Sequence, residues 1–432
     1  MSRIAIIGSG IAGMTVAHRL HGTHELTLFE ANDYAGGHTA TVDVELRGRQ
    51  YAIDTGFIVF NDWTYPNFIA LLEELGVEWQ WSNMSFSLRC ERTGLEYNGT
   101  SVNSLFAQRR NALRPSFLRM ISDILRFNTR SRELLAGADE SLTLGEYLGR
   151  GGYSRAFTER YIVPMGRAIW SATEQAMLGF PARFFVDFFD RHGFLNVDDR
   201  PVWRTVRGGS REYARRLLAP LRHRIRLRTP VAGVRRDARG VDLRTARGEV
   251  ERFDYVVFAC HSDQALALLE APTPQEREIL GAFPYQENEA LLHTDTRMLP
   301  RRPLARAAWN YHLLERAQPQ VALTYDMNRL QTLTAPEVFM VTLNRAEDID
   351  AARVLGRYVY HHPVYTPAAV AAQHRRAEIS GANRSFFCGA YWRYGFHEDG
   401  VVSGLWAVED IARATGMSLA APLVRAPARR AG

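Results

Sequence analysis

Hydrophobic positions change their spacing twice within the first thirty residues of the chain. Residues 3–7 form a short, continuous apolar run, which is typical of a buried strand. Apolar residues then recur at helical spacing, at Ile11, Met14, Ala17 and Leu20. Residues 25–29 are rich in β-forming side chains, and the acidic residue Glu30 follows them. The pattern predicts a strand, a helix and a second strand.

The turn between the first strand and the helix carries glycine at positions 8, 10 and 13, in G-x-G-x-x-G spacing. The first glycine permits a tight bend, the second lets the backbone approach a pyrophosphate at the helix N-terminus, and the third lets helix and strand pack closely. Glu30 can accept hydrogen bonds from both hydroxyls of a ribose. A turn that binds nothing is the alternative, but the strands, helix and acid all agree with binding. The predicted dinucleotide contacts are Gly8, Ser9, Gly10, Ile11, Ala12, Gly13, Glu30 and Ala31.

A second glycine turn follows, too soon for an ordinary NAD-binding domain to need it. It consists of Gly36, Gly37, His38 and Thr39. Alternating patterns then predict strands at residues 41–46 and 51–54, after which Thr55 and Gly56 break the alternation. Residues 65–75 predict a short amphipathic helix.

The middle of the chain predicts a hairpin at residues 85–99 and then mostly helical sequence up to residue 199. Within it, residues 113–127 place five apolar residues on one helix face, namely Phe117, Met120, Ile121, Ile124 and Leu125. Arginines occupy other positions of the same helix. A basic amphipathic helix can lie on a lipid surface, whereas the alternative is a helix packed in the core with solvated arginines. We favour the packed helix.

The second half of the chain alternates strands and helices. A turn with Gly208 and Gly209 precedes a helix, and strands are predicted at residues 231–236, 241–245 and 255–259. Four further strands are predicted at residues 289–293, 307–312, 321–326 and 338–343. Near the end, a strand that stops at Cys388 precedes a glycine turn and a closing helix from about Gly400. The tail 422–432 is rich in Ala, Pro and Arg and is expected to be disordered.

Composition narrows the class of protein. A chain of 432 residues usually needs more than one core, and its 46% hydrophobic content is ample for globular domains. The net charge of +6 comes with no arginine-rich recognition helix that carries stacking aromatics, so no nucleic-acid partner is expected. The three cysteines lie far apart without metal-ligand spacing, so neither a disulfide nor a metal is expected.

The N-terminus and the hydropathy pattern bear on location. No charged and apolar leader precedes the first strand, and no run of 18 apolar residues occurs. We therefore expect a cytoplasmic protein. Such a protein can also contact the inner face of the membrane peripherally, and the sequence leaves this alternative open.

Three separated motifs resemble the flavin-containing amine oxidoreductase superfamily, which includes amine oxidases, protoporphyrinogen oxidase and phytoene-type desaturases. They are the N-terminal unit with GGHTAT at residues 36–41, TPVAGV around Val231, and FFCGAYWRYGFHEDGVVSG at residues 386–404. The resemblance implies an α/β fold with a Rossmann-type FAD-binding domain and a discontinuous α+β substrate domain. The FAD-binding domain is expected to comprise residues 1–84, 204–269 and 380–421, and the substrate domain residues 85–203 and 270–379.

The resemblance changes the cofactor prediction from NAD to FAD and implies further contacts. These are Gly36, Gly37, His38, Thr39, Thr55, Gly56, Phe57, Val231, Gly389, Ala390, Phe396, His397, Glu398 and Val401. Ala390 stands where the superfamily often has an acid, so the ribityl contact is expected from Glu398 or a backbone amide. All 53 basic residues are arginine, so the lysine that many amine oxidases place beside the flavin is absent. An arginine, a histidine or a different electron acceptor would replace it.

Several stretches resemble, more narrowly, a bacterial subfamily of predicted NAD/FAD-binding proteins. They include DTGFIVFNDWTYPNF, RYIVPMGRAIWS and YHHPVYTP. Members are often encoded beside lipid methyltransferases, and some relatives are linked to dehydrogenation of methyl-branched fatty acyl chains. The resemblance implies a hydrophobic, acyl-lipid substrate and a methyltransferase partner. An amine or small-molecule oxidase, and a non-catalytic flavin-bearing partner of a methyltransferase, are the alternatives.

Flavin-dependent oxidation needs little acid or base from the protein, because the flavin is the electron sink. If a base removes a proton, His312, His361 and His362 are the candidates, the last two in a predicted loop before Pro363. The N-terminus of the closing helix is expected to stabilise negative charge on the flavin. An acyl substrate predicts a long apolar tunnel, whereas an amine predicts an aromatic cage beside the flavin.

Overall fold

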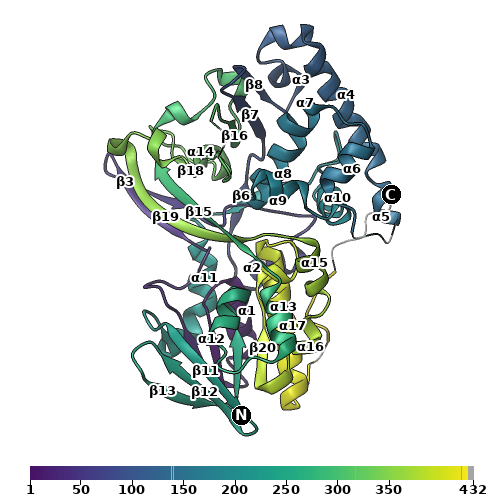
Figure 1. The fold of residues 1–432 in the computed structure, drawn as a ribbon. Coiled ribbons are helices and arrows are strands. Elements are labelled where there is room, and N and C mark those ends of the chain that lie inside the picture. Colours follow the sequence, from purple (N-terminus) through teal and green to yellow (C-terminus); the bar gives the residue numbers. More distant parts are fainter. Residues whose placement is uncertain (138, 140, 317, 420, 427–432) are drawn as a thin grey trace.

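The apolar run at residues 3–7 forms β1 (Arg3–Ile7), the central strand of a five-stranded parallel sheet (Figure 1). The computed structural model describes residues 1–137, 139, 141–316, 318–419 and 421–426. The other strands of this sheet, in the order β10-β2-β1-β14-β20, are β2 (Glu25–Phe29), β10 (Ile225–Arg226), β14 (Tyr255–Phe258) and β20 (Ser385–Phe387). Parallel strands are buried on both faces, which accounts for their continuous apolar sequences.

Two layers cover this sheet, and together they form the parallel-sheet unit. Ile4 and Ile6 share a core with four helices, α1 (Ile11–Leu20), α2 (Pro66–Glu74), α11 (Arg211–Leu218) and α17 (His397–Thr415). Ala5 and Ile7 face an antiparallel sheet of β11 (Val231–Asp237), β12 (Gly240–Thr245) and β13 (Val250–Phe253). The helices on that side are α12 (Ser262–Leu268), α13 (Pro274–Gly281), α15 (Pro367–Gln373) and α16 (Arg376–Ile379).

The second body, the mixed-sheet unit, is built on a seven-stranded sheet in the order β19-β15-β18-β17-β16-β7-β8. Its strands are β7 (Phe86–Cys90), β8 (Leu95–Asn98), β15 (Tyr285–His293), β16 (Trp309–Leu313), β17 (Leu323–Asp326), β18 (Met340–Leu343) and β19 (Val354–Pro363). Strands β7 and β16 pair in parallel, and the other described pairs are antiparallel. The long strands β15 and β19 curve between the two bodies in Figure 1.

Helices from residues 102–191 complete the core of the mixed-sheet unit. They are α3 (Val102–Leu105), α4 (Pro115–Arg130), α5 (Glu133–Ala136), α6 (Leu144–Arg150), α7 (Arg155–Phe157), α8 (Val163–Trp170), α9 (Glu174–Leu178) and α10 (Ala182–Arg191). Two small sheets add to these cores, the first to that of the mixed-sheet unit and the second to that of the parallel-sheet unit. One pairs β3 (Thr41–Leu46) with β4 (Arg49–Asp54), and the other contains β5 (Phe60–Asn61), β9 (Trp203–Val206) and β6 (Trp79–Trp81).

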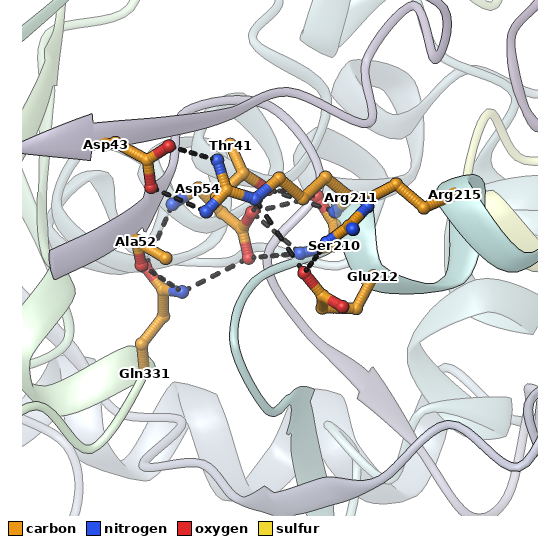
Figure 2. A network of polar contacts seen from close by, with 9 residues as sticks. All are labelled: Thr41, Asp43, Ala52, Asp54, Ser210, Arg211, Glu212, Arg215 and Gln331. Carbon is orange, nitrogen blue, oxygen red and sulfur yellow. Dashed lines mark hydrogen bonds and ion pairs between the residues drawn. The ribbon is translucent and has the colours of Figure 1, made fainter. Parts of the chain in front are cut away.

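A buried polar network ties the two bodies together where β4 ends (Figure 2). The Asp54 carboxylate accepts hydrogen bonds from the Ser210 amide (2.9 Å) and hydroxyl (2.8 Å), at the start of α11. It also accepts from the Thr41 hydroxyl (2.6 Å) and from the side-chain amide of Gln331 (3.2 Å), which follows α14 (Met327–Leu330) of the mixed-sheet unit. Burial nevertheless raises the pKa of Asp54 to about 6.

The predicted fold class is confirmed, and the predicted N-terminal strand, helix and strand match β1, α1 and β2. Two expectations about local structure are wrong. The closing helix α17 begins at His397 rather than near residue 400. His361 and His362 lie in the edge strand β19 rather than in a loop. Proline is tolerated at the end of an edge strand, so Pro363 is compatible with a strand at these positions.

Helix α4 packs in the core as favoured, because Phe117, Met120 and Phe127 are buried. Leu125, expected on the same face, is 53% exposed. The predicted domain boundaries need a correction, since α13, α15 and α16 fall inside residues 270–379 but pack in the parallel-sheet unit. The tail predicted as disordered from residue 422 begins with ordered contacts, in which Arg425 exchanges backbone hydrogen bonds with the Asn67 side chain. Residues 427–432 lie outside the described part.

Candidate cofactor and substrate cavity

A cavity of about 830 Å³ is lined by both bodies of the protein. At one end its walls come from the carboxyl ends of β1, β2 and β14 and from the N-terminus of α1. Ligands of parallel α/β sheets bind at this edge. At the other end the walls come from the mixed sheet and from helices α8 and α10. The volume lies in the upper part of the range for small-molecule pockets, about 300–1,000 Å³.

The three glycines of the N-terminal turn have different roles at the first end of the cavity. Gly8 has a φ of +102°, and a Cβ there would stand 2.7 Å from the Ala259 carbonyl oxygen. A Cβ at Gly13 would stand 2.1 Å from the Gly8 carbonyl oxygen, so Gly13 serves the packing of α1 and lies outside the cavity wall. A Cβ at Gly10 would meet no atom within 4 Å. The backbone at Gly10 is therefore open to a ligand.

Helix α1 presents an uncapped N-terminus at this point. Gly10 is its N-cap residue, no side chain caps it, and its first turn contains no acidic residue. The free amides and the helix dipole attract an anion. The residues present therefore fit the diphosphate of a dinucleotide.

Glu30 organises the same end of the cavity. One carboxylate oxygen accepts hydrogen bonds from the Ser9 amide (3.0 Å) and hydroxyl (2.5 Å), and the other accepts from the Asn32 amide (2.9 Å). The Ser9 hydroxyl in turn accepts a hydrogen bond from the Gly36 amide (3.1 Å), which links the two glycine turns. Glu30 is the acid among the residues that line the cavity, and its remaining lone pairs are available to ribose hydroxyls.

The C-terminal glycine turn and the start of α17 line the middle of the cavity, but not as expected in every detail. Because α17 begins at His397, its free amides are those of the first turn, residues 397–399, rather than that of Val401, which is buried in the core. Glu398 lies outside the cavity wall. Its carboxylate accepts hydrogen bonds from the amides of Asn67 (3.1 Å) and Phe68 (2.8 Å) at the start of α2. The ribityl contact predicted for Glu398 is therefore wrong, and a backbone amide stays the alternative.

His397 is held in one orientation at the start of α17. Its ring stacks on Phe57 with 3.6 Å between centroids, and its Nε2 lies 2.6 Å from the Tyr213 hydroxyl. Tyr213 also contacts Thr39, which stands behind the cavity wall. Burial lowers the pKa of His397 well below its ordinary value, so the ring is neutral.

Four histidines gather in the cavity wall near the second glycine turn. His38 lies 5.5 Å from His362 and 6.3 Å from His261 between ring centroids, and His261 lies 6.3 Å from His361. Burial, followed by the neighbouring histidines, lowers the pKa of His38 and of His261 to about 4 and that of His362 to about 3. His38 Nε2 is buried without a hydrogen-bond partner, as expected where a ligand atom completes the site.

Two members of this cluster differ in what they can do. The Asn288 side-chain amide lies 3.2 Å from Nδ1 of His362 and donates to it, because the Asn288 oxygen accepts from Asn344. A neutral His362 therefore carries its proton on Nε2 and acts there as a donor, not as a base. His361 lies toward the surface, 3.5 Å from the Glu287 carboxylate.

His312, the third predicted base, is not in the cavity. Side chains alternate between the faces of a strand, and Trp309, three residues earlier in β16, is the one that lines the cavity. His312 lies on the opposite face, where its Nε2 is 2.9 Å from the Thr324 hydroxyl. Burial lowers its pKa well below the ordinary value. The prediction that His312 is catalytic is therefore wrong.

The far end of the cavity is apolar and aromatic. One wall is a single face of the mixed sheet, which contributes Trp309, Tyr325, Leu343 and Tyr360. The opposite wall consists of Ile169 and Trp170 from α8, Phe188 from α10 and Phe194, which follows α10. Tyr394 and Phe396 close the side next to α17. No aspartate, glutamate or arginine of the described residues lines this end.

Comparison with known proteins identifies the family. The sequence model of the flavin-containing amine oxidoreductase family matches residues 11–300. The chain belongs to this family. It is an FAD-dependent oxidoreductase, and the cavity end with Gly10 and Glu30 is where its residues fit the adenosine diphosphate half of FAD. No curated protein sequence matches the chain.

Solved structures share the fold of this flavoenzyme at low identity. Cyclohexylamine oxidase from Brevibacterium oxydans IH-35A superposes with a TM-score of 0.71 at 16% identity, covering 96% of this chain and 99% of that chain. A CLA-producing fatty acid isomerase from P. acnes gives 0.66 at 16% identity, covering 95% and 98%. A protein described as a putative protoporphyrinogen oxidase from Exiguobacterium sp. 255-15 gives 0.66 at 17% identity, covering 95% and 98%.

Most predicted FAD contacts line the cavity of this flavoenzyme. They are Gly8, Ser9, Gly10, Ile11, Ala12, Glu30, Ala31, Gly37, His38, Thr55, Gly56, Phe57, Val231, Gly389, Ala390, Phe396 and His397. Gly13, Gly36, Thr39, Glu398 and Val401 stand outside its wall. Among the described residues no arginine lines the cavity, so of the predicted replacements for the missing lysine, histidine is present and arginine is not.

Sequence reasoning missed His261 and the aromatic wall of Trp170 and Phe188. His261 could have been found, because it follows the buried strand β14 at the carboxyl edge of the parallel sheet, where ligands bind. Trp170 and Phe188 could not have been found in this way, because α8 and α10 carry apolar side chains both toward the cavity and toward the core.

Proposed function

We propose that this flavoenzyme oxidises an uncharged, hydrophobic substrate, and that an acyl lipid chain is the class its cavity suits best. The observation that carries the proposal is the uncharged, apolar and aromatic lining of the far end of the cavity. Burying an unpaired charge in such surroundings is strongly unfavourable. A protonated amine would find no carboxylate there, and a free fatty acid would find no arginine.

An esterified acyl chain avoids both problems, because its chain is apolar and its headgroup can stay outside. The flat wall of the mixed sheet, from Trp309 through Tyr325 and Leu343 to Tyr360, offers an extended apolar track against which such a chain can lie. One structural neighbour is described as a fatty acid isomerase, which supports the use of this fold with acyl chains.

Bound FAD would supply the electron sink by accepting a hydride from one C–H bond, while the proton lost from the adjacent carbon would pass to a neutral histidine of the cavity wall. The protein positions the substrate with the rings of Trp170, Tyr394 and Phe396 and excludes water with them. Free amides at the start of α17 can donate to negative charge on the reduced ring, whereas Glu398 and Asp399 in the same turn oppose that charge when they are ionised. The Nε2 proton of neutral His362 would be available as a hydrogen-bond donor to bound FAD, and neutral His397, held by Tyr213, adds no charge.

The direct test is anaerobic mixing of the FAD-loaded protein with candidate substrates while the flavin absorbance at about 450 nm is followed. We expect bleaching by a phospholipid with a methyl-branched acyl chain, and bleaching at least about tenfold slower by the free acid of the same chain, which must lose its hydration without a partner. Full retention of colour with all lipids, combined with bleaching by primary amines, would overturn the acyl-lipid proposal.

An amine is the second candidate, because aromatic rings line both walls of the far end. Trp309 and Tyr325 lie on the side of the mixed sheet, and Trp170 and Phe188 lie on the side of the helices. With no carboxylate to bind an ammonium group, only the neutral amine would react. The rate of flavin reduction would then rise with pH up to the pKa of the amine, whereas an ester gives no such rise.

A further inference from the structure

Exposed aliphatic side chains gather at the end of the mixed-sheet unit that carries α3 and α4, at the top of Figure 1. Leu113 is 87% exposed and Val102 is 75% exposed. Leu118 and Leu125 of α4 and Leu304 of the 3-10 helix Pro303–Ala305 are also exposed. Large aliphatic residues at such exposure are common singly, but a group of five on one end marks an interaction surface.

The same end is rich in arginine. Residues 97–122 and 296–306 contain eight arginines and no aspartate or glutamate. Within the described chain no carboxylate lies within 4.0 Å of the Arg110, Arg114, Arg301 or Arg302 guanidinium groups, whereas Arg119 and Arg297 of the same segments pair with Asp123 and Asp295. We call the four arginines without a carboxylate partner, together with the five aliphatic residues, the basic aliphatic surface.

Hydrogen bonds join the two segments into one surface. The buried Glu96 carboxylate of β8 accepts from the amides of Arg301 (2.9 Å) and Arg302 (3.0 Å). The Asn98 side-chain amide donates to the Arg306 carbonyl (3.0 Å), beside the start of α3. The surface is therefore built on a rigid strand end and not on a free loop.

This surface adjoins the apolar end of the cavity. Trp309, which lines the cavity, follows Arg306 by three residues and pairs with Phe86 of β7. Three residues span at most about 11 Å of extended chain. The basic aliphatic surface and the aromatic wall are therefore neighbours along the chain.

We propose that the basic aliphatic surface docks the protein on an anionic lipid bilayer. Unpaired arginines are attracted to the negative surface of the bilayer, and exposed leucine and valine side chains insert at the boundary between headgroups and acyl chains. Nucleic acid is disfavoured as the partner, because the exposed apolar residues here are aliphatic and offer no rings for base stacking. The inference does not depend on which substrate the cavity takes.

The test is co-sedimentation of the full-length, FAD-loaded protein with vesicles of phosphatidylcholine alone or with phosphatidylglycerol. We expect binding to the anionic vesicles, weakened by salt as the charges are screened. Each arginine beside such a surface strengthens binding by about fivefold, so Arg110→Gln with Arg302→Gln is expected to weaken it by about 25-fold. Leu113→Ser, at an exposed position, is expected to weaken binding without changing the melting temperature.

Matched controls come from the opposite end of the molecule, the β11–β13 sheet at the bottom of Figure 1. Arg239→Gln with Arg247→Gln removes the same charge, and Val250→Ser changes a residue that is 62% exposed. These variants are expected to bind vesicles as the unmodified protein does. Equal losses in both pairs, no binding to anionic vesicles, or tighter binding to an RNA oligomer than to vesicles would each overturn the proposal.

Discussion

The open backbone at Gly10 allows cofactor binding to be separated from folding. Gly10 has φ −64° and ψ 176°, a conformation available to any residue, and a Cβ there meets no protein atom within 4 Å. Gly10→Val would instead occupy the space in which a diphosphate approaches the amides of α1. Hydrogen bonds to a charged group contribute about 1.5–3 kcal/mol each, so loss of two costs about 3–6 kcal/mol. The Kd for FAD is expected to rise by about 10²- to 10⁴-fold.

Gly13→Val is the matched comparison, because its Cβ would stand 2.1 Å from the Gly8 carbonyl oxygen. This variant is expected to unfold, or to melt far below the unmodified protein. The Gly10→Val apoprotein loses only the modest N-cap preference of glycine, at most about 1 kcal/mol. Melting of the apoproteins and titration with FAD, followed by flavin fluorescence, measure both effects. Normal FAD affinity in Gly10→Val, or equal loss of stability in both variants, would refute the reasoning.

Three further predictions follow from buried groups. Burial raises the pKa of Asp54 from 3.8 to about 6, so the folded protein holds this proton more tightly than the unfolded chain does. The resulting contribution to the free energy of unfolding is fully present below pH 3.8, and about 3 kcal/mol of it is lost as the pH rises through 6. Urea unfolding of Asp54→Asn at several pH values should lack this loss, and parallel pH profiles would contradict it. Glu276→Gln leaves the buried Arg236, now 2.5 Å from the Glu276 carboxylate, without a counter-charge and should cost about 3–5 kcal/mol in the same assay. His312→Gln should leave the rate of flavin reduction unchanged, and a slowed reduction would restore His312 as a catalytic candidate. His362→Leu, which removes the Nε2 donor, should raise the Kd for FAD by about fivefold through one lost hydrogen bond.

The cofactor end could be predicted from the sequence because its information is local. Gly8, Gly10, Gly13 and Glu30 lie within one strand-helix-strand unit, and each residue type has a backbone or hydrogen-bonding reason to be there. The prediction failed at Glu398 because a start of α17 only three residues earlier turns that carboxylate toward the amides of α2.

The sequence also does not show on which face of a sheet a side chain lies. The pattern at residues 307–312 predicted β16 correctly, but the side on which His312 lies depends on which face of the sheet the helices cover. His361 and His362 lie in β19, whose side chains alternate between half-buried and exposed positions at the edge of the sheet. An edge strand buries too little to stand out from a loop in the sequence pattern.

The substrate end of the cavity could not be predicted from the sequence, because its wall forms only when distant segments fold together. Its wall is assembled from β16, β17, β18, β19, α8 and α10, which are separated by up to two hundred residues, and each contributes one or two ordinary core side chains. Nothing in any single segment marks Trp170 or Tyr325 as lining rather than core. Folding brings these side chains together, and among the described residues no charged side chain joins them at this end of the cavity. Since a buried charge without a partner is costly, that lining selects for the uncharged part of a substrate before any catalytic group acts.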